Sequence, residues 1–343
     1  MRALAALLLA LCLAACSTPQ PQGVTELVYA TPYSPNHPFS KADQTWIKHV
    51  EQASGGTIRI KPSWSGALLS SEMSMEELRH GVADIGLITP IYVKGGTHLI
   101  RIQSGFYSGA DSMPAQVALY RCIAAANPEI GQELDGLQVL AVQGGSLPGI
   151  VTTTQPIHAL DDLKGLRLRA PTELLTVLGS LGADPVNMPM SEVYSAMAKG
   201  VIDGVIAPAD TFRALHFAEV ARHFNTLKVP RGAYPARAMG ARRWASLTDA
   251  QRAVLTAAIP VWEAALEREI VSALQKGMDE AHAKRVAVRP MPAADQARFD
   301  ALYLRDAERN ARSLSALGID GLKAFRTARA SISKRDSVSC KEG

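Results

Sequence analysis

Residues 163–208 read LKGLRLRAPTELLTVLGSLGADPVNMPMSEVYSAMAKGVIDGVIAP, and this stretch decides the fold class. Its first part, 163–171, alternates apolar and basic side chains up to a proline, which is the pattern of a short strand. Helical patterns follow at 172–182 and again at 191–200. An apolar segment at 201–208 then predicts one more strand. Strands that alternate with helices in this way predict an α/β fold with a largely parallel sheet.

The same alternation precedes this stretch. Strand patterns at 26–31, 57–64 and 83–90 are separated by helical patterns at 41–54 and 71–81. Two rounds of alternation predict two α/β lobes. The chain length agrees with this prediction, because 343 residues exceed a single domain of roughly 150 residues.

The C-terminal third is predicted to be mostly helical. Thr248 and Gln251 fit a capping box at the start of a helix. An apolar stripe on a long helix follows over 255–274. Pro260 lies inside that stripe and predicts a kink. We interpret Trp262, on the same stripe, as a packing residue.

The composition excludes several function classes. With 47% hydrophobic residues, 20% charged residues and a net charge of +4, the chain is globular and lacks the basic stripe of a nucleic-acid-binding protein. It contains no Walker loop, no Gly-x-Ser-x-Gly elbow and no His-Glu-x-x-His motif. The eight histidines lack metal-ligand spacing. We therefore expect a protein that is not an enzyme and has no metal or cofactor site.

The N-terminus has the pattern of a secretory signal peptide. One basic residue, Arg2, is followed by an apolar run that ends in LAAC at Cys16. LAAC resembles the lipobox of bacterial lipoproteins, so we expect residues 1–15 to be removed and residues 16–25 to form a lipidated tether in the periplasm. Ser17, which is not an aspartate, favours the outer membrane if the source is Gram-negative. The alternative is an ordinary signal peptide that contains a cysteine.

Two cysteines remain after such a cleavage, Cys122 and Cys340. An exported compartment permits disulfides. A bridge between these two residues would tie the C-terminal tail to the rest of the protein. Two unpaired thiols are the other interpretation, and the sequence does not decide between them.

Arg169 is the residue that best combines charge with position. In open α/β sheets, ligands bind beyond the carboxyl ends of the strands. Arg169 ends its predicted strand, whereas Arg167 lies one pleat back inside it. A guanidinium group can bind a carboxylate through two parallel hydrogen bonds, and it stays charged when half buried. Arg169 is therefore a candidate anion-binding residue, and an ordinary solvated charge is the alternative for either arginine.

The order of these segments resembles a signature of the solute-binding proteins of tripartite ATP-independent periplasmic (TRAP) transporters, DctP type. The resemblance rests on residues 161–208, on ASGGTIRIKPSWSGALLSSEMSMEELRHGVADIGL at 53–87 and on RRWASLTDAQRAVLTAA at 242–258. It extends over most of the chain, from 26 to 330. It implies a two-lobed periplasmic binding protein fold, class II-like, with crossing strands and a long kinked C-terminal helix.

The resemblance also implies a division of the chain and a mode of action. Lobe I would comprise 26–146 and about 235–275, and lobe II would comprise 147–234 and about 276–335. The two lobes would close on a ligand, and TRAP membrane permease subunits would then take the ligand over. A ligand-sensing lipoprotein that reports to a sensor kinase is the alternative on the same scaffold.

The family's carboxylate-binding arginine corresponds to Arg169, and Arg167 corresponds to a basic position that usually faces solvent. Family pockets also draw on other segments, where packing or loop structure is the alternative for every residue. The candidates there are Tyr33 to His37, Trp64, Glu72, Thr89, Tyr92, Phe106, Tyr107 and Pro208.

Two departures from the family pattern indicate the kind of ligand. Ala207 stands where many relatives have an asparagine, and Asp210 and Thr211 could supply polar contacts instead. The stretch LPGIVTTTQPI at 147–157 has no basic residue, whereas relatives that bind acidic sugars often carry an arginine there. Both changes make the pocket more apolar. We therefore expect a small organic acid with one carboxylate and an aromatic, branched or 2-oxo body.

Overall fold

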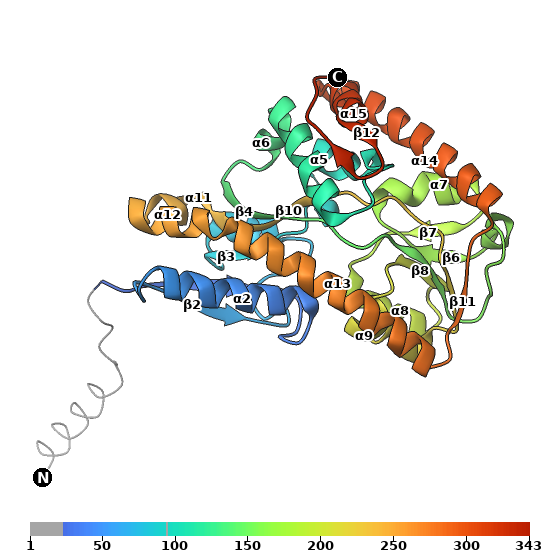
Figure 1. Cartoon of the computed structure of the whole chain (residues 1–343), viewed down its shortest axis with the longest axis horizontal. Helices are drawn as coiled ribbons and strands as arrows, with labels where there is room; N and C mark the ends of the chain where they lie inside the picture. Colours follow the sequence, from blue (N-terminus) through green and yellow to red (C-terminus); the bar gives the residue numbers. More distant parts are fainter. Residues whose placement is uncertain (1–22, 94) are drawn as a thin grey trace, which may run out of the picture.

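The computed structural model describes residues 23–93 and 95–343, and it confirms the predicted two-sheet α/β architecture. Figure 1 shows two sheets with helices around both. The first sheet has five strands in the order β2-β1-β3-β10-β4, and the second has six in the order β11-β9-β5-β8-β6-β7. Cys16, the signal peptide and most of the tether lie outside the described residues. No helix of the described part is long and apolar enough to cross a membrane.

The elements have the following bounds. The strands are β1 (Thr25–Ala30), β2 (Ile58–Ser63), β3 (Ile85–Leu87), β4 (Leu137–Gln143), β5 (Gly149–Thr152), β6 (Arg167–Arg169), β7 (Asp184–Val186), β8 (Gly204–Ala207), β9 (His223–Asn225), β10 (Tyr234–Gly240), β11 (Ala287–Arg289) and the hairpin β12 (Ile332–Lys334) with β13 (Ser337–Val338). The α-helices are α2 (Pro38–Ala53), α3 (Ser74–His80), α4 (His98–Ile102), α5 (Met113–Ala126), α6 (Glu129–Glu133), α7 (Leu175–Ser180), α8 (Met190–Ala198), α9 (Thr211–Ala214), α10 (Phe217–Val220), α11 (Ala241–Ala245), α12 (Asp249–Ala257), α13 (Ile259–Ala283), α14 (Ala293–Ser313) and α15 (Gly321–Ser331). Short 3-10 helices are η1 (Pro90–Tyr92), η2 (Gln103–Phe106), η3 (Leu160–Leu163), η4 (Thr172–Leu174) and η5 (Leu314–Leu317).

Both sheets are mixed, which corrects the prediction of a largely parallel sheet. In the first sheet β1 is parallel to β2 and β3, but β10 is antiparallel to β3 and β4. In the second sheet β6 is parallel to β7 and β8, but β5 is antiparallel to β8 and β9. The chain passes from one sheet to the other three times. The first two passages, residues 144–148 and residues 226–233, are short, and we call them the crossing segments. The third, from β10 to β11, contains helices α11, α12 and α13. Strands β5 and β10 each enter a sheet directly after a crossing segment. Each is therefore antiparallel to the neighbouring strands in its sheet.

The long C-terminal helix is broken where proline predicted a kink. Thr248 and Gln251 form the predicted capping box, with Gln251 N donating to Thr248 Oγ1 (3.2 Å) and Thr248 N donating to Gln251 Oε1 (3.1 Å). Helix α12 ends before Ala258, and Pro260 stands in the first turn of α13, where its missing N–H costs nothing. Figure 1 shows α13 crossing the molecule, and it packs on α2 at one end and on α9 at the other. This helix therefore joins the helices around both sheets.

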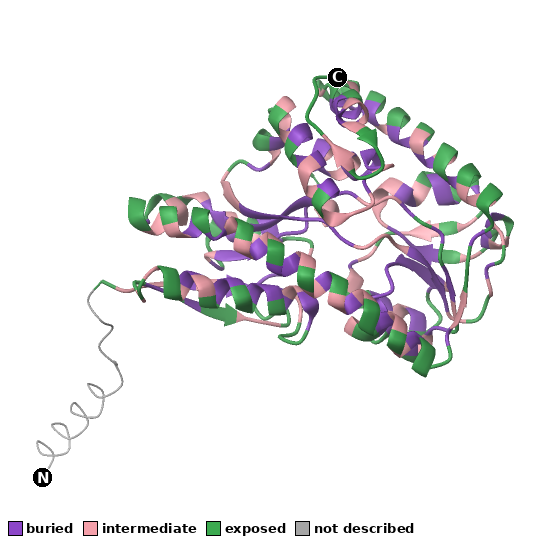
Figure 2. Cartoon of the chain, in the orientation of Figure 1, coloured by how far each residue is buried: buried purple, intermediate pink, exposed green. Residues whose placement is uncertain are grey.

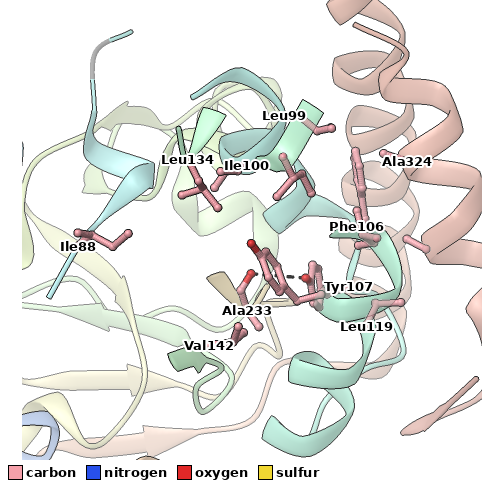
Figure 3. Packing of buried hydrophobic residues seen from close by; sticks show 14 of the residues in the cluster. Ile88, Leu99, Ile100, Phe106, Tyr107, Leu119, Leu134, Val142, Ala233 and Ala324 are labelled. Carbon is pink, nitrogen blue, oxygen red and sulfur yellow. Dashed lines mark hydrogen bonds between the residues drawn. The ribbon is translucent and has the colours of Figure 1, made fainter. Parts of the chain in front are cut away.

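Four clusters of buried apolar side chains form the core, and the strands that carry most of them are buried in Figure 2. Trp262 stacks on Trp46 with 3.8 Å between ring centroids, and its Nε1 donates to Asp43 Oδ1 (2.9 Å). The prediction that Trp262 is a packing residue is confirmed. In the cluster of Figure 3, the Tyr107 hydroxyl donates to Gln103 Oε1 (2.7 Å) and also lies 3.4 Å from the Ala233 carbonyl oxygen, so its polar atom is satisfied inside the core.

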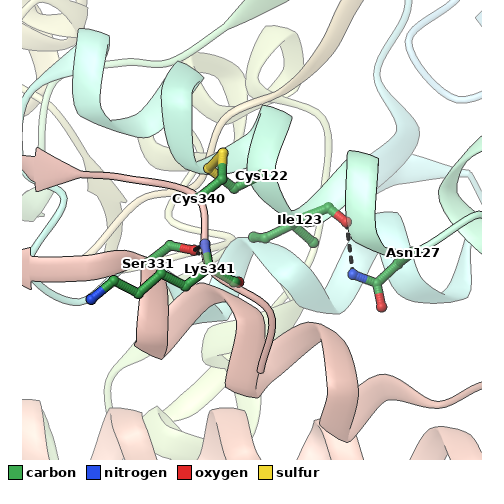
Figure 4. The surroundings of a disulfide bond; sticks show 6 residues. All are labelled: Cys122, Ile123, Asn127, Ser331, Cys340 and Lys341. Atoms are coloured by element: carbon green, nitrogen blue, oxygen red, sulfur yellow. Dashed lines mark hydrogen bonds between the residues drawn. A yellow bond between two sulfur atoms is a disulfide. The ribbon is translucent and has the colours of Figure 1, made fainter.

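A disulfide settles the open question about the cysteines. Cys122 on α5 and Cys340 near the C-terminus are bonded, with their Cα atoms 5.0 Å apart (Figure 4). Helix α15 packs on α5 next to this bridge, and its buried residues belong to the same cluster as those of η2. The lobe boundaries given above remain a prediction. This packing favours assigning residues 321–343 to the first lobe rather than to the second.

Candidate functional site

A cavity of about 120 Å³ is lined by residues that follow strands of both sheets. The segments after β1 and β3 supply part of its wall, and those after β6 and β8 supply another part. The crossing segments close it with Pro148 and with residues 229–232. A cavity therefore lies beyond the carboxyl ends of these strands, where the ligand site is expected. Its polar and aromatic residues include Tyr33, His37, Phe39, Thr89, Tyr92, Arg169, Glu173, Asp210, Thr211, Arg231 and Tyr234.

Arg169 ends β6, as predicted, and its side chain is 4% exposed. Its Nε donates to the Met188 carbonyl (2.9 Å), and its Nη2 donates to the Tyr92 hydroxyl (2.7 Å). Within the described residues, Nη1 has no hydrogen-bond partner and no carboxylate oxygen lies within 4.0 Å of the guanidinium group. A buried cation without a counter-ion is costly. Arg169 therefore has both the free donors and the electrostatic need for an anion.

Arg167 has the ordinary role that its position predicted. It is exposed, and its Nε donates to Asp184 Oδ2 (2.8 Å) in a solvent-accessible ion pair. An exposed pair of this kind contributes little to stability. The two arginines of one strand thus have different surroundings, because Leu168 packs into the core, Arg167 lies at the exposed start of β6 and Arg169 lies at the cavity.

The wall after β1 is aromatic and uncharged. His37 caps α2, because its Nδ1 accepts from Phe39 N (3.2 Å), and its ring stacks on Tyr33 with 4.1 Å between centroids. Burial, with the nearby Arg237 charge, lowers the pKa of His37 to about 3. Burial also raises the pKa of the Tyr33 hydroxyl. Both groups are therefore neutral at physiological pH, and this wall offers an anion aromatic surface without repulsion.

Two acidic residues border the cavity together with the arginines. Burial raises the pKa of Glu173 to about 7, although the charges of Arg169 and Arg231 oppose that shift. Burial raises the pKa of Asp210 to about 6, again against the charge of Arg231. One oxygen of each carboxyl group, Glu173 Oε2 and Asp210 Oδ1, is buried without a hydrogen-bond partner in the described structure. These oxygens are open to a ligand group or to a proton.

The other polar residues of the wall are partly satisfied by the protein. Thr89 Oγ1 donates to the Ser71 carbonyl (3.0 Å), and Thr211 Oγ1 donates to the Pro208 carbonyl (2.7 Å). Their hydroxyl protons are used, so each can only accept from a ligand. Ala207, which replaces the family's asparagine, ends β8 and is fully buried.

Four of the predicted residues that lie outside the cavity are Phe106, Tyr107, Trp64 and Glu72. Phe106 is fully buried in the core, where its ring meets Phe325 edge-on (5.3 Å between centroids) and points toward Ala324 in Figure 3. Trp64 packs edge-on against Tyr29 (5.8 Å), and Glu72 is exposed. The cavity thus does not include these candidates, because Phe106, Tyr107 and Trp64 pack in or against the apolar core and Glu72 faces solvent. It brings together Thr89, Tyr92, Arg169 and Asp210.

Glu173 and Arg231 are cavity residues that the sequence analysis missed. Glu173 follows Arg169 by four residues, on η4, and only its burial distinguishes it from a surface acid. Arg231 lies on a crossing segment without any periodic pattern. No group of three His, Cys, Asp or Glu residues that could hold a metal ion occurs among residues 23–93 and 95–343.

Comparison with known proteins places the chain among binding proteins. Residues 29–309 match the family model described as bacterial extracellular solute-binding protein, family 7 (DctP). A solute-binding protein of Albidiferax ferrireducens is 26% identical over 200 residues, which are 56% of each chain. The sialic acid-binding periplasmic protein SiaP of Vibrio cholerae is 35% identical over 74 residues, 21% of this chain and 23% of that one. The chain spans about half or less of the length of the curated relatives it matches.

Solved structures share the fold. A TRAP solute-binding protein of Rhodoferax ferrireducens, in complex with copurified benzoate, has a TM-score of 0.81 at 24% identity and covers 90% of this chain and 97% of its own. A TRAP periplasmic solute-binding protein of Bordetella bronchiseptica with bound mandelate has a TM-score of 0.78 at 19% identity, covering 90% and 98%. Both likenesses extend over nearly the whole described chain.

Proposed function

The chain belongs to family 7 of the bacterial extracellular solute-binding proteins (DctP), and on that premise we propose that it captures a small monocarboxylate in the cavity around Arg169 for a TRAP permease. The single observation that carries the proposal is the buried, unneutralised guanidinium group of Arg169. The protein binds and releases its ligand and performs no chemistry on it.

The carboxylate occupies the free side of Arg169. Nη1 is unused, and Nη2 keeps one proton beyond the one donated to Tyr92, so two parallel donors are available to a carboxylate. Charge-assisted hydrogen bonds of this type are stronger than neutral ones. The fold has already removed most of the water around this cation, so a carboxylate ligand supplies the missing counter-charge.

Ligand contacts from both sheets favour closure. Tyr92 follows β3 of the first sheet, and Arg169 ends β6 of the second. A ligand held between them contacts both halves at once, and it stabilises the closed arrangement by its differential affinity for that state. The permease then recognises the closed, ligand-bound state of the protein.

The cavity volume and lining favour an acid with a compact, apolar body. The cavity measures about 120 Å³, which limits the ligand to a compact body. The apolar part of its lining includes Ile91, Met190, Ile206 and Leu215. The relatives with bound benzoate and mandelate are compatible with such a ligand. An aromatic, branched or 2-oxo monocarboxylate is the proposed class.

The location follows from the family and from the N-terminal sequence. Family members are extracellular by description, and we propose a periplasmic protein anchored by lipid at Cys16. Attachment through Cys16 would keep it at a membrane surface. No observation on the described residues favours the sensing alternative, so transport is the function proposed.

Mass spectrometry of the native protein after purification tests this proposal. We expect a copurified organic acid that is released on denaturation and returns unchanged after incubation with the protein. Added back to the stripped protein, it should raise the melting temperature. Conversion of the acid to a product, or the absence of stabilisation by any small carboxylate, would contradict the proposal.

A further inference from the structure

A second guanidinium group, that of Arg231, borders the cavity and has no established role. Arg231 lies on the crossing segment 226–233, between β9 of one sheet and β10 of the other. Among the described residues its one hydrogen bond is a long one, from Nη1 to the Ser146 carbonyl (3.4 Å). No carboxylate oxygen of the described chain lies within 4.0 Å of it. Most of its donors are therefore unused.

The fold provides a support for this side chain. A Cβ atom at Gly145 would lie 2.4 Å from Arg231 Cζ, 2.6 Å from Nη1 and 2.7 Å from Nε, so the guanidinium group packs directly on this glycine and would have to move if a side chain were added there. Gly145 is itself fixed, because its N–H donates to Gln116 Oε1 (2.8 Å) and its carbonyl accepts from Gln116 Nε2 (3.1 Å). Gln116 is fully buried. The two crossing segments thus meet where the Arg231 guanidinium group packs on Gly145.

The acids near Arg231 do not neutralise it directly. Its charge acts on both Glu173 and Asp210, yet neither forms an ion pair with it. Each of these carboxyl groups keeps one buried oxygen without a partner. The cavity therefore holds two cations with free donors, Arg169 and Arg231. A ligand that has a carboxylate and one further oxygen atom could accept hydrogen bonds from both.

We infer that Arg231 is a second ligand-binding residue, which donates hydrogen bonds to an oxygen atom of the bound acid at the crossing segments. This inference rests on the proposed capture of a small acid at Arg169. The oxygen belongs either to the carboxylate or to a second group such as a 2-oxo oxygen. Because Arg231 lies on a segment that connects the two sheets, its contact with the ligand would form at the junction of the two halves.

The test compares two acids that differ in a single group. Phenylacetate and benzoylformate have the same ring and carboxylate, but benzoylformate has a carbonyl where phenylacetate has a methylene. Calorimetry measures the affinity of each acid for the wild type, Arg231→Gln and Arg231→Lys. The melting temperature of each ligand-free variant is measured as well, so that variants as stable as the wild type are compared. Arg167→Ala, which changes an exposed arginine, is the matched control.

Arg231→Gln should weaken binding at least tenfold, and Arg231→Lys should recover part of the loss. An equal loss for both acids assigns Arg231 to the carboxylate, and a loss for benzoylformate alone assigns it to the second oxygen. Unchanged affinity for both acids overturns the inference. If the wild type is stabilised by no acid, the proposed function itself fails; if only Arg231→Gln is without effect while Arg169→Ala abolishes binding, the inference alone fails.

Gly145→Ala provides an independent variant, because it displaces the guanidinium group without removing it. It should weaken binding about as much as Arg231→Gln, and the double variant should be no weaker than Arg231→Gln alone. Gly131→Ala, at an exposed glycine with nothing within 4 Å of the added Cβ, is the control. Additive losses in the double variant would mean that Gly145 acts apart from Arg231, and would overturn the proposed support.

Discussion

Arg169 Nη2 donates a 2.7 Å hydrogen bond to the Tyr92 hydroxyl, and this bond connects the end of β6 in the second sheet to the segment after β3 in the first. The guanidinium carbon also lies 5.8 Å from the centre of the Tyr92 ring. The residue proposed to hold the carboxylate is therefore also a contact between the two halves. The proposed ligand binding and the proposed closure would therefore share one side chain.

Tyr92→Phe should open the ligand-free protein and weaken ligand binding. The variant removes the hydroxyl that accepts from Arg169 and leaves the ring in place. A hydrogen bond to a charged group contributes about 1.5–3 kcal/mol, so we expect affinity to fall roughly tenfold or more. Small-angle scattering of the ligand-free variant should show a larger radius of gyration.

Tyr194→Phe is the matched control for that variant. It removes an equivalent hydroxyl, which donates to Glu219 Oε2 (2.9 Å) at the exposed surface. We expect neither affinity nor radius of gyration to change. If Tyr92→Phe behaves like this control, the bond between Arg169 and Tyr92 has no part in closure.

Glu173→Gln should change how stability depends on pH. The pKa of Glu173 is raised from 4.5 to about 7, so the folded state favours the protonated acid. That contribution to stability is complete below pH 4.5 and is lost as the pH rises through 7. Glutamine mimics the neutral acid, so the variant should match the wild type at pH 4.5 and exceed it at pH 8 by up to roughly 3 kcal/mol.

Denaturant unfolding of both proteins between pH 4.5 and pH 8 measures this difference. Asp210 titrates in the same window, but it is present in both proteins and its effect cancels. Glu72→Gln, at an exposed glutamate, serves as the control and should show no pH-dependent gain. A constant difference between Glu173→Gln and the wild type across the range would mean that folding does not raise the pKa of Glu173.

Asp43→Asn should destabilise the protein strongly. Asp43 is fully buried on α2 and accepts from Arg237 Nε (2.8 Å), from Trp262 Nε1 (2.9 Å) and from the Tyr29 hydroxyl (2.5 Å). Removing the charge leaves Arg237 buried without a counter-ion, which costs about 3–5 kcal/mol. Thermal and denaturant unfolding check this loss.

Asp184→Asn is the comparison for that loss. It breaks the exposed pair with Arg167, so it should cost less than about 1 kcal/mol. Similar losses for both aspartates would contradict the role of Asp43 as the counter-ion of a buried network.

Removing the disulfide should lower stability without lowering affinity. Cys122→Ala with Cys340→Ala releases the C-terminal segment from α5, and the loss of a native disulfide typically costs about 2–5 kcal/mol. Neither cysteine lines the cavity. Calorimetry with the copurified acid should therefore give the wild-type affinity, and a large change in affinity would show that the C-terminal segment supports the site.

The sequence predicted those parts of the fold that local patterns encode. Strands β6 and β8 and helices α7 and α8 follow from periodicity, and the capping box at Thr248 follows from residue type and spacing. The antiparallel strands β5 and β10 were missed, because their direction depends on where the chain crosses between sheets. That is a property of the whole fold rather than of any short segment.

The site was predicted in part for the same reason. Arg169 ends a strand that the pattern identifies, so its place at the cavity could be inferred. Arg231 and Glu173 lie in short irregular or 3-10 segments, and only the assembled lobes bring them to the cavity. Phe106 was misassigned because an aromatic residue in a loop gives the same signal whether it lines a cavity or completes a core.

The central claim is that Arg169 holds the ligand's carboxylate, and calorimetric titration of the copurified acid into Arg169→Ala tests it most directly. The wild type, with the acid at 100 times its dissociation constant, should be stabilised by about 2.7 kcal/mol. Arg169→Ala should lose at least a hundredfold in affinity, whereas Arg167→Ala should stay within twofold of the wild type. A folded Arg169→Ala variant that binds the acid as tightly as the wild type would contradict the claim.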